Sequence, residues 1–413
     1  MTFYAKIYII IKESTKTERM DYTMDKVRIG VIGIGGMGSW HATYLYKGEV
    51  EGACLAAVCD IEPSKLSWAK EKFNNEIPVF DNYIDLIDSG LCDAVIVATP
   101  HYFHPTILVY AFEKGLHGLT EKPAGVFTKQ VLEMNAAAEK SDKIFGIMYN
   151  QRTNPLYQKV RKMIQDGELG ELRRCNWIIT NWYRTQSYYD SGTWRATWSG
   201  EGGGVLTNQC PHNLDLWQWI FGMPTRVKAS CYIGKYHDIE VEDDVTIYAE
   251  YANGATGLFV TTTGEFPGTN RLEITGDKGK VVIEHGAKYT KLQIGSQEFI
   301  QGSSGGFDTP PCEDIDILPE GIETGHVGIT QNFANAILKG DKLLAPGYEG
   351  INGLQISNAA YLSGWTGGEF IDLPVDCDVY YEELKKKIAC SKNKEAIKTN
   401  PLNFDGTFNN SSK

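Results

Sequence analysis

Two short segments of the chain carry side chains that can move a proton on a substrate. The first is Thr-Glu-Lys-Pro-Ala-Gly at 120–125, which contains Lys122. The second runs from the Gly-Gly-Gly at 202–204 to His212. Histidine changes its charge near neutral pH and is a natural base for a hydroxyl proton, and a nearby lysine ammonium stabilises a developing alkoxide. The pattern alone leaves open that His212 is a buried core residue and that Lys122 is a surface charge.

A glycine-rich segment near the start of the chain predicts a dinucleotide site. It has the form G-x-G-x-x-G, follows the apolar run VRIGVI at 27–32 and precedes a helical stretch. In this context the first glycine permits a tight turn, the second lets the backbone approach a pyrophosphate, and the third lets the helix pack on the strand. The predicted cofactor-binding residues here are Gly33, Gly35, Gly36, Met37 and Gly38.

An acid after the next predicted strand indicates which dinucleotide binds. Asp60 ends the apolar run CLAAVCD at 54–60. A carboxylate there accepts hydrogen bonds from the adenosine ribose hydroxyls and repels a 2′-phosphate, so NAD is favoured over NADP. With NAD as hydride acceptor, the chemistry predicted for Lys122 and His212 is the oxidation of an alcohol, with His212 taking the hydroxyl proton.

The elements that must position these residues alternate between strands and helices over residues 25–150. This alternation predicts an α/β fold with an NAD-binding Rossmann domain, a doubly wound parallel sheet whose strands are near-continuous apolar runs. Lys122 and Asn150-Gln151-Arg152 follow two of these strands, and such sheets bind ligands at the carboxyl ends of their strands. Further strands of this sheet are predicted within 93–100, 115–125 and 143–150.

The pattern changes near residue 150, and longer alternating segments predict a second, catalytic domain over 151–375. We expect a large open, mostly antiparallel sheet with a helix near 212–221 packed on it. Asn253-Gly254 and Asp277-Lys278-Gly279 are hairpin turn signals. The alternating segments lie at 172–184, 226–234, 243–266 and 271–286, and further helices are predicted at 155–166, 326–340, 348–364 and 379–389.

The two ends of the chain are expected to lie outside these domains. Residues 1–24 hold one short apolar run, which is too short for a signal-peptide core, so we expect a disordered leader or a start codon placed too early. Residues 376–413 predict a last helix and a polar tail. The sequence has no segment long and apolar enough to span a bilayer.

The composition limits the classes of partner. Lysine and arginine number 40 against 52 aspartates and glutamates, a formal charge of −12, which argues against nucleic acid because binding its phosphates needs a basic surface. Nine cysteines without a CxxC pair fit a reducing cytoplasm and give no metal-ligand spacing. We therefore expect a cytoplasmic protein that acts on a small molecule, without a metal, a membrane or a nucleic acid as partner.

Aromatic residues are dense between 177 and 198, with Arg184 and Arg195 among them. Aromatic faces stack on the apolar faces of sugar rings, while arginine and amide groups bond the hydroxyls, so this composition favours a carbohydrate or polyol substrate. Aromatic residues also dominate cores and interfaces, and we expect part of this set to lie there. The predicted substrate-binding residues from this reasoning are Arg152, Tyr183, Arg184 and Trp194.

Taken in order along the chain, these motifs resemble the glucose–fructose oxidoreductase, inositol dehydrogenase and MocA family. The resemblance runs from about Val27 to about Pro374, and it adds ATPHYFHP at 98–105 and PGYEGINGLQISNAAYLSG at 346–364. It implies a Rossmann domain, a second domain with an open antiparallel sheet, and a homodimer or homotetramer formed through that sheet.

The resemblance also implies roles for particular residues. Lys122 is expected to touch both the substrate and the nicotinamide ribose, and His212 to be the catalytic acid and base. Pro123 stands where the family often has a cis peptide. Further cofactor contacts are expected from Thr99, Pro100, His104 and Glu121.

The sequence departs from the family at one position of the catalytic motif. The family usually has aspartate four residues before the catalytic histidine, and this chain has Asn208. On a helix these positions share a face, so Asn208 can bond the substrate or His212, but it cannot supply negative charge. Asp215, one turn further on, is expected to orient His212, to contact substrate or to be structural. Pro211 must start the helix or kink it.

The sequence therefore predicts an NAD-dependent dehydrogenase that reversibly oxidises a secondary hydroxyl of a cyclic sugar, glycoside or inositol. The broad aromatic entrance favours a glycoside, with oxidation at ring position 3 as a hypothesis. One alternative is a redox-neutral glycoside hydrolase, in which bound NAD oxidises the sugar transiently before the aglycone leaves. The other is an NAD-binding regulator without catalysis, which would be expected to lack Lys122 or His212.

Overall fold

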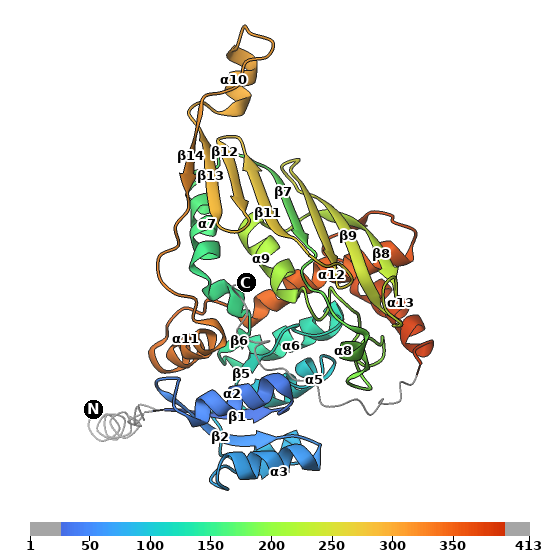
Figure 1. Ribbon diagram of the computed structural model, residues 1–413. Helices are drawn as coiled ribbons and strands as arrows, with labels where there is room; N and C mark the ends of the chain where they lie inside the picture. Colours follow the sequence, from blue (N-terminus) through green and yellow to red (C-terminus); the bar gives the residue numbers. More distant parts are fainter. Residues whose placement is uncertain (1–25, 393–413) are drawn as a thin grey trace, which may run out of the picture.

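The computed structural model describes residues 26–392, so the predictions for the leader and for the polar tail lie outside the described residues. Its first sheet has six parallel strands in the order β3-β2-β1-β4-β5-β6 (Figure 1). The strand order reverses between β1 and β4, which is the place where a doubly wound sheet opens a ligand crevice. The strands are β1 (Val27–Ile32), β2 (Ala53–Cys59), β3 (Val79–Phe80), β4 (Ala94–Val97), β5 (His117–Thr120) and β6 (Phe145–Ile147).

Helices connect these strands and cover the sheet, as the alternation of patterns predicts. Four of the six strands are buried along all of their length or nearly so, and three of these, β1, β4 and β6, are mostly apolar, so they form the centre of the domain. The helices of this part are α2 (Gly36–Tyr46), α3 (Pro63–Lys72), α4 (Tyr83–Asp88), α5 (Phe103–Glu113) and α6 (Thr128–Ser141).

The second sheet has nine strands in the order β14-β13-β12-β11-β7-β10-β9-β8-β15. Strands β7 and β10 pair in parallel, and the other neighbours in the sheet pair antiparallel, so the predicted mostly antiparallel sheet is confirmed. The strands are β7 (Leu172–Ile179), β8 (Arg226–Ile233), β9 (Glu242–Glu250), β10 (Thr256–Thr262), β11 (Asn270–Gly276), β12 (Gly279–Ile283), β13 (Ala287–Leu292), β14 (Cys312–Asp316) and β15 (Ile371–Asp372).

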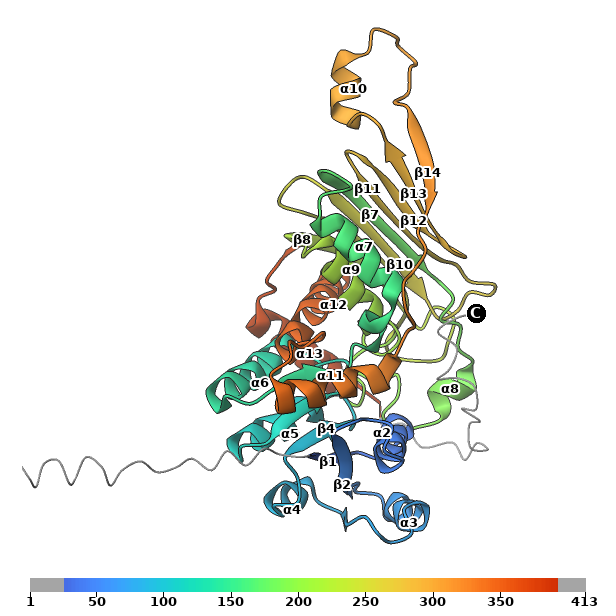
Figure 2. The ribbon, with the colours of Figure 1, turned by 90° about the vertical axis from the view of Figure 1, so that its left-hand side faces the viewer.

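One face of the nine-stranded sheet is covered by helices and the other is open (Figures 1 and 2). Helices α7, α9 and α12 lie on the covered face, where Trp177, Trp217 and Phe259 form part of a continuous apolar core. The helices and turns of this part are η1 (Asn150–Thr153), α7 (Pro155–Gln165), α8 (Gln186–Asp190), α9 (Pro211–Phe221), α10 (Ser296–Gly302), α11 (Gly325–Lys339), η2 (Gly347–Glu349), α12 (Gly350–Trp365) and α13 (Cys377–Ala389).

An arm formed by β13, α10 and β14 projects beyond the rest of the sheet (Figure 2). The sequence pattern leaves this arm unassigned, because its residues follow neither a strand nor a helix period over a useful length. The two hairpin turns predicted from sequence do connect strands, at Asn253-Gly254 between β9 and β10 and at Asp277-Lys278 between β11 and β12.

The segment that follows the arm returns to the first sheet. Ile329 and Phe333 of α11 and Leu354 of α12 belong to the same apolar core as β1, β4 and β5. The hydroxyl of Tyr44 on α2 lies 2.7 Å from that of Thr330 on α11. The two sheets are therefore joined through α12, whose residues belong to the apolar cores of both. Among residues 26–392, no helix is long and apolar enough to cross a membrane.

Candidate active site

The glycine loop after β1 has the backbone that a dinucleotide phosphate needs. Gly33 has φ +84°, and a Cβ there would lie 2.8 Å from the backbone of Ala98. A Cβ on Gly38 would lie 1.7 Å from the carbonyl oxygen of Gly33, so helix α2 packs directly on the turn. At Gly35, by contrast, a Cβ would meet nothing within 4 Å. This open space lies before the first turn of α2, whose N-terminus has no side-chain cap, and it fits a phosphate.

Asp60 lies beside this loop, at the carboxyl end of β2. One carboxylate oxygen accepts a hydrogen bond from the amide of Ile34 at 2.8 Å, and the other accepts from the amide of Glu62 at 3.0 Å. The side chain is partly exposed, so the carboxylate is fixed in direction and still faces the space beside the glycine loop. This placement fits the predicted contact with the adenosine ribose. The glycine loop and Asp60 together fit NAD.

Lys122 follows β5, and its ammonium crosses to the second domain. Nζ donates a hydrogen bond to the carbonyl oxygen of Asn208 at 2.9 Å. The peptide before Pro123 is cis, as the family resemblance implies. Burial lowers the pKa of Lys122, while the negative charges of Glu121 and Glu201 oppose that shift. The lysine therefore lies at the carboxyl edge of the parallel sheet, in contact with the motif that carries His212.

His212 is the second residue of α9, because Pro211 starts that helix rather than kinking it. The imidazole is 9% exposed, and its Nδ1 is buried without a hydrogen bond in the described residues. Burial, followed by the positive charge of Lys122, lowers the pKa of His212 well below its usual value. The ring is therefore neutral at physiological pH, which is the state in which it accepts a proton.

Asn208 lies outside α9, so the helical spacing assumed for the pair does not hold. Since α9 begins at Pro211, Asn208 belongs to the turn before it and does not share a helix face with His212. Its side-chain amide donates to a carboxylate oxygen of Glu201, and to the hydroxyl of Tyr188 at 3.3 Å. The structure thus brings Asn208 to Lys122 through its backbone and to Glu201 through its side chain.

Asp215 and Arg152 form a buried ion pair behind the site. Nε of Arg152 lies 2.8 Å from one carboxylate oxygen of Asp215, and Nη2 lies 2.6 Å from the other. Burial opposes the charge of Arg152, but the carboxylates of Asp215 and Glu349 outweigh it and raise its pKa. Both residues were predicted to bind substrate, and Asp215 alternatively to orient His212. The structure directs their polar groups to each other, and a role of either residue in substrate binding stays a prediction.

Glu121 and His104 also support the site from behind. Glu121 is buried and lies 2.7 Å from Nε2 of His41. The ring nitrogens of His104 lie 2.7 Å from the carbonyl oxygen of Thr99 and 2.9 Å from that of Pro123. The contacts of His104 join the loops after β4 and β5, and the contact of Glu121 joins the end of β5 to His41 on α2. Thr99 and Pro100 are partly exposed at the same edge.

The aromatic segment, residues 182–198, runs from the end of β7 to the glycine stretch. Trp194 contacts the ring of His101, at the edge of the first domain, with 5.7 Å between ring centroids. The guanidinium of Arg195 lies 4.7 Å from the ring centroids of both Trp194 and Tyr188. Arg184 lies 5.2 Å from the same Tyr188 ring. The structure thus brings Trp194 and Arg184 together with two residues that the sequence did not single out for the pocket.

Other aromatic residues of this part serve the fold, as expected for part of the set. Trp177, Tyr189 and Trp198 are buried in the core of the second domain. Tyr183 is 48% exposed, and its ring packs on Phe266 with centroids 5.8 Å apart. The ring of Tyr183 thus packs on Phe266, while its carbonyl oxygen accepts a hydrogen bond from the guanidinium of Arg184 at 2.8 Å.

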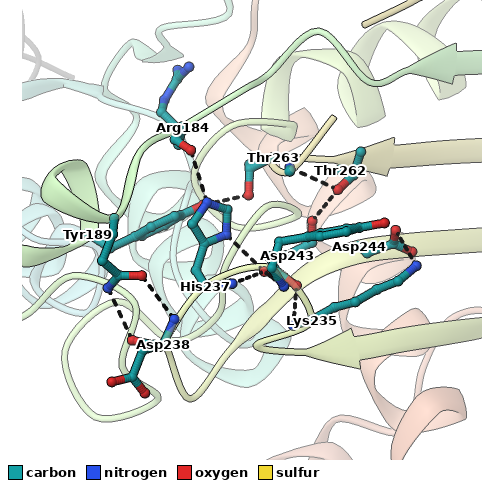
Figure 3. Close-up of polar contacts among 12 residues, drawn as sticks. Arg184, Tyr189, Lys235, His237, Asp238, Asp243, Asp244, Thr262 and Thr263 are labelled. Carbon is teal, nitrogen blue, oxygen red and sulfur yellow. Dashed lines mark hydrogen bonds and ion pairs between the residues drawn. The ribbon is translucent and has the colours of Figure 1, made fainter. Parts of the chain in front are cut away.

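A polar network holds the aromatic segment against the second sheet (Figure 3). The ring of His237 lies between an oxygen of Asp243, 2.9 Å from Nδ1, and the carbonyl oxygen of Arg184, 2.9 Å from Nε2. Asp243 also accepts hydrogen bonds from three successive backbone amides, those of Lys235, Tyr236 and His237. The network holds the backbone of the aromatic segment in place at Arg184.

Sequence reasoning missed Glu201, and it placed Tyr188 and Arg195 in the aromatic segment without assigning them to the pocket. Glu201 is 1% exposed and contacts both Asn208 and the amide of Ala196. A signal was present, since an acid stands directly before three glycines, but a lone glutamate has no spacing that separates it from a surface residue. No group of three or more histidine, cysteine or acidic side chains that could hold a metal ion occurs in residues 26–392.

The fold and the site define a two-domain oxidoreductase with a dinucleotide crevice at the carboxyl edge of the first sheet. Residues 27–149 match a family model described as an oxidoreductase family with an NAD-binding Rossmann fold. Residues 157–282 match the GFO/IDH/MocA C-terminal domain. The two matches together cover more than half of the chain. The protein belongs to the GFO/IDH/MocA family of NAD-binding oxidoreductases, so the predicted family and cofactor are confirmed.

Curated and solved relatives share this architecture. An inositol 2-dehydrogenase from Corynebacterium glutamicum is 28% identical over 197 residues; the match spans 48% of this chain and 54% of the relative, about half its length. The scyllo-inositol 2-dehydrogenase (NAD(+)) of Bacillus subtilis is 26% identical, over 86% of this chain and 97% of the relative. The WlbA dehydrogenase from Chromobacterium violaceum, solved in complex with NADH and UDP-GlcNAcA, superposes with a TM-score of 0.71 at 28% identity, over 85% of this chain and 97% of that one.

Proposed function

We propose that the protein is an NAD-dependent dehydrogenase that reversibly oxidises a secondary hydroxyl of a cyclic sugar, glycoside or inositol. The observation that carries this proposal is the junction of Lys122 with the turn before His212, through the 2.9 Å hydrogen bond from Nζ to the carbonyl oxygen of Asn208. This contact supports the proposal because it brings the ammonium of Lys122 to the turn that leads into His212. The inositol dehydrogenases and the sugar-nucleotide complex among the relatives support the substrate class.

Each residue of the site has a distinct task in this reaction. The imidazole of His212 takes the hydroxyl proton, because its lowered pKa keeps it unprotonated. The ammonium of Lys122 donates to the substrate oxygen and stabilises the charge that develops there. Tyr188, Arg195 and Trp194 offer the aromatic faces and donors that bind a polyol ring. Bound NAD supplies the hydride acceptor, and the glycine loop and Asp60 are the residues that would hold it.

The test is NADH formation with a panel of free sugars, inositols and glycosides. The His212→Ala and Lys122→Ala variants serve as controls, with thermal melting to show that each is folded. Oxidation of one substrate class that is lost in both variants supports the proposal and identifies the substrate class. If only free inositol is oxidised, the preference for a glycoside is wrong while the dehydrogenase assignment stands.

The same assay separates the two alternatives. A redox-neutral glycoside hydrolase releases free aglycone without accumulating NADH, which product analysis detects directly. An NAD-binding regulator binds NAD in calorimetry and converts none of the panel, and its NAD affinity is unchanged in His212→Ala. Either result would contradict the dehydrogenase proposal.

We also propose that the protein forms a homodimer or homotetramer through the open face of the nine-stranded sheet. The open face carries apolar side chains on the neighbouring strands β7, β10 and β9. At least partly exposed there are Ile178, Leu258, Val260 and Tyr248. Such an apolar face on a sheet is typical of an interface. The mass of the protein in solution measures its oligomeric state, and Leu258→Glu is expected to give monomers.

We propose a cytoplasmic location as well. All nine cysteines are free thiols, which supports it.

A further inference from the structure

Glu201 is a buried acid within the candidate active site that the proposed mechanism does not use. One carboxylate oxygen accepts a hydrogen bond from the backbone amide of Ala196 at 2.6 Å, and the other accepts from the side-chain amide of Asn208. Nη1 of Arg195 lies 3.9 Å from that second oxygen. Burial raises the pKa of Glu201, while Arg195, the Ala196 amide, Asn208 and Lys122 oppose that shift and favour the charged carboxylate.

We propose that Glu201 is a positioning residue, whose carboxylate fixes the amide of Asn208 and provides the negative charge that balances Lys122 in the buried site. The proposal rests on the proposed function, because it assigns Glu201 to the same Lys122 and His212 chemistry. It supplies from position 201 the charge that Asn208 cannot supply.

The contact with Glu201 sets the direction of the side-chain amide of Asn208. A carboxylate only accepts hydrogen bonds, so the amide nitrogen of Asn208 must face Glu201 and its oxygen must face away. The reverse orientation would place two acceptor oxygens against each other in a buried site. The same nitrogen lies 3.3 Å from the hydroxyl of Tyr188, which agrees with this direction. The side-chain oxygen of Asn208 thereby stays available as an acceptor for a substrate hydroxyl.

The charges around Lys122 also support this role of Glu201. Burial lowers the pKa of Lys122 most. The positive charges of Arg195 and Arg184, from the aromatic segment, lower it further, so all three disfavour the protonated form. Two carboxylates oppose them, those of Glu121 and Glu201.

Glu121 is already engaged with His41, at 2.7 Å, so it is shared between two partners. His101, in the loop after β4, donates a hydrogen bond from Nδ1 to the backbone carbonyl oxygen of Glu201, and burial lowers its pKa and keeps it neutral. Tyr188 adds a neutral hydroxyl. Glu201 is the carboxylate on the second-domain side of the site whose charge favours protonated Lys122, and it also faces Arg195 at 3.9 Å.

The geometry allows a reciprocal exchange as the test, with the variants Glu201→Gln, Asn208→Asp and the double variant. Asn208→Asp places two carboxylates against each other, and Glu201→Gln removes the charge. The double variant restores an amide–carboxylate pair with the two groups exchanged. We expect each single change to lower kcat by about tenfold or more, and the double variant to recover most of that loss. A side chain that only fills space would give a double variant no better than the product of the two single effects, which would overturn the proposal.

The pH profile adds a readout that a purely structural role would not move. Removing a negative neighbour lowers the pKa of Lys122, so the alkaline limb of kcat/KM is expected at lower pH in Glu201→Gln than in the unchanged protein. Asp190→Asn serves as a control, since this acid lies in the same segment and has not been placed in the site. An alkaline limb that stays in place in Glu201→Gln contradicts the charge role.

Stability measurements keep this test independent of the proposed activity. In Asn208→Asp the paired carboxylates repel each other, so the denaturation midpoint is expected to fall at neutral pH and to recover at low pH, where one of them takes a proton. The double variant is expected to recover at neutral pH as well. If every substrate in the panel is silent, the dehydrogenase proposal fails while this cycle still reports on the pair. An Asn208→Asp variant as stable as the unchanged protein at neutral pH would overturn the pairing.

Discussion

The guanidinium of Arg152 and the carboxylate of Asp215 meet at 2.6 and 2.8 Å, and their side chains are 0% and 1% exposed. Asp215 lies one helical turn after His212 on α9, and Arg152 belongs to the η1 turn after β6. The pair therefore fixes the helix that carries the candidate base against the last strand of the first sheet. It links the geometry of the site to the stability of the fold.

Removing one partner of this pair is expected to destabilise the protein strongly. Asp215→Asn leaves a buried guanidinium with one fewer negative partner, and a loss of about 3–5 kcal/mol of unfolding free energy is expected. The double variant Arg152→Met/Asp215→Leu removes both charges and is expected to lose less, because Glu349 is partly exposed and can be solvated. Chemical denaturation of the three proteins measures this, and a double variant less stable than Asp215→Asn would contradict it.

The acid limb of the oxidation reaction is expected below the usual pKa of histidine. Burial, Lys122 and His326 all disfavour the protonated ring of His212, so its pKa lies well below 6.5. A base must be unprotonated, and a lowered pKa keeps it so to lower pH. The value of kcat/KM for the sugar or polyol should therefore stay level as pH falls through the range in which a free histidine takes its proton. A profile that halves near pH 6.5 would show that another group is the base.

Much of this arrangement follows from local patterns. The apolar runs and glycines that predict β1 and α2 act within a few residues of each other, so their outcome is readable from the sequence. The pairing of Arg152 with Asp215 is not, because it joins residues 63 positions apart through two different elements. Without that partner, an arginine after a strand and an aspartate after a histidine both resemble site residues.

The same reasoning explains the position of Asn208. A spacing of four residues indicates a shared face only inside a helix, and proline favours the first turn of a helix. Pro211 starts α9, so Asn208 falls in the turn before it and its side chain meets Glu201 instead of His212. The sequence contained both facts, but the contact between residues 201 and 208 depends on a turn whose shape is set by the surrounding fold.

Neutralising Asp60 is expected to weaken the preference for NAD. Asp60→Asn keeps the size of the side chain and removes the charge that would repel a 2′-phosphate, so the ratio of kcat/KM for NADP to that for NAD is expected to rise about tenfold. Glu62→Gln is the matched control, because its side chain is exposed nearby while only its backbone amide contacts Asp60. Steady-state kinetics with both cofactors measure the ratio, and an equal change in the two variants would contradict a specific role for Asp60.

His237 is expected to affect substrate affinity through the aromatic segment, without contacting the substrate itself. Its ring joins Asp243 to the carbonyl oxygen of Arg184, each at 2.9 Å, so it fixes the point at which the aromatic segment begins (Figure 3). His237→Leu leaves the buried carboxylate of Asp243 with its backbone donors but removes the contact to the carbonyl oxygen of Arg184, whose amide still donates to Thr263. The segment should then sample more conformations, and the entropy of ordering it would be lost on each binding event.

The expected result is a rise of about tenfold in KM for the sugar or polyol, with KM for NAD little changed, because the glycine loop and Asp60 do not contact this network. Limited proteolysis gives a second readout, since a loosened segment is cut faster within residues 182–198. His285→Asn is the matched control, as His285 is exposed and lies in the turn between β12 and β13, outside the network of His237. Equal changes in KM for both substrates would show that His237 acts on the fold as a whole rather than on the aromatic segment.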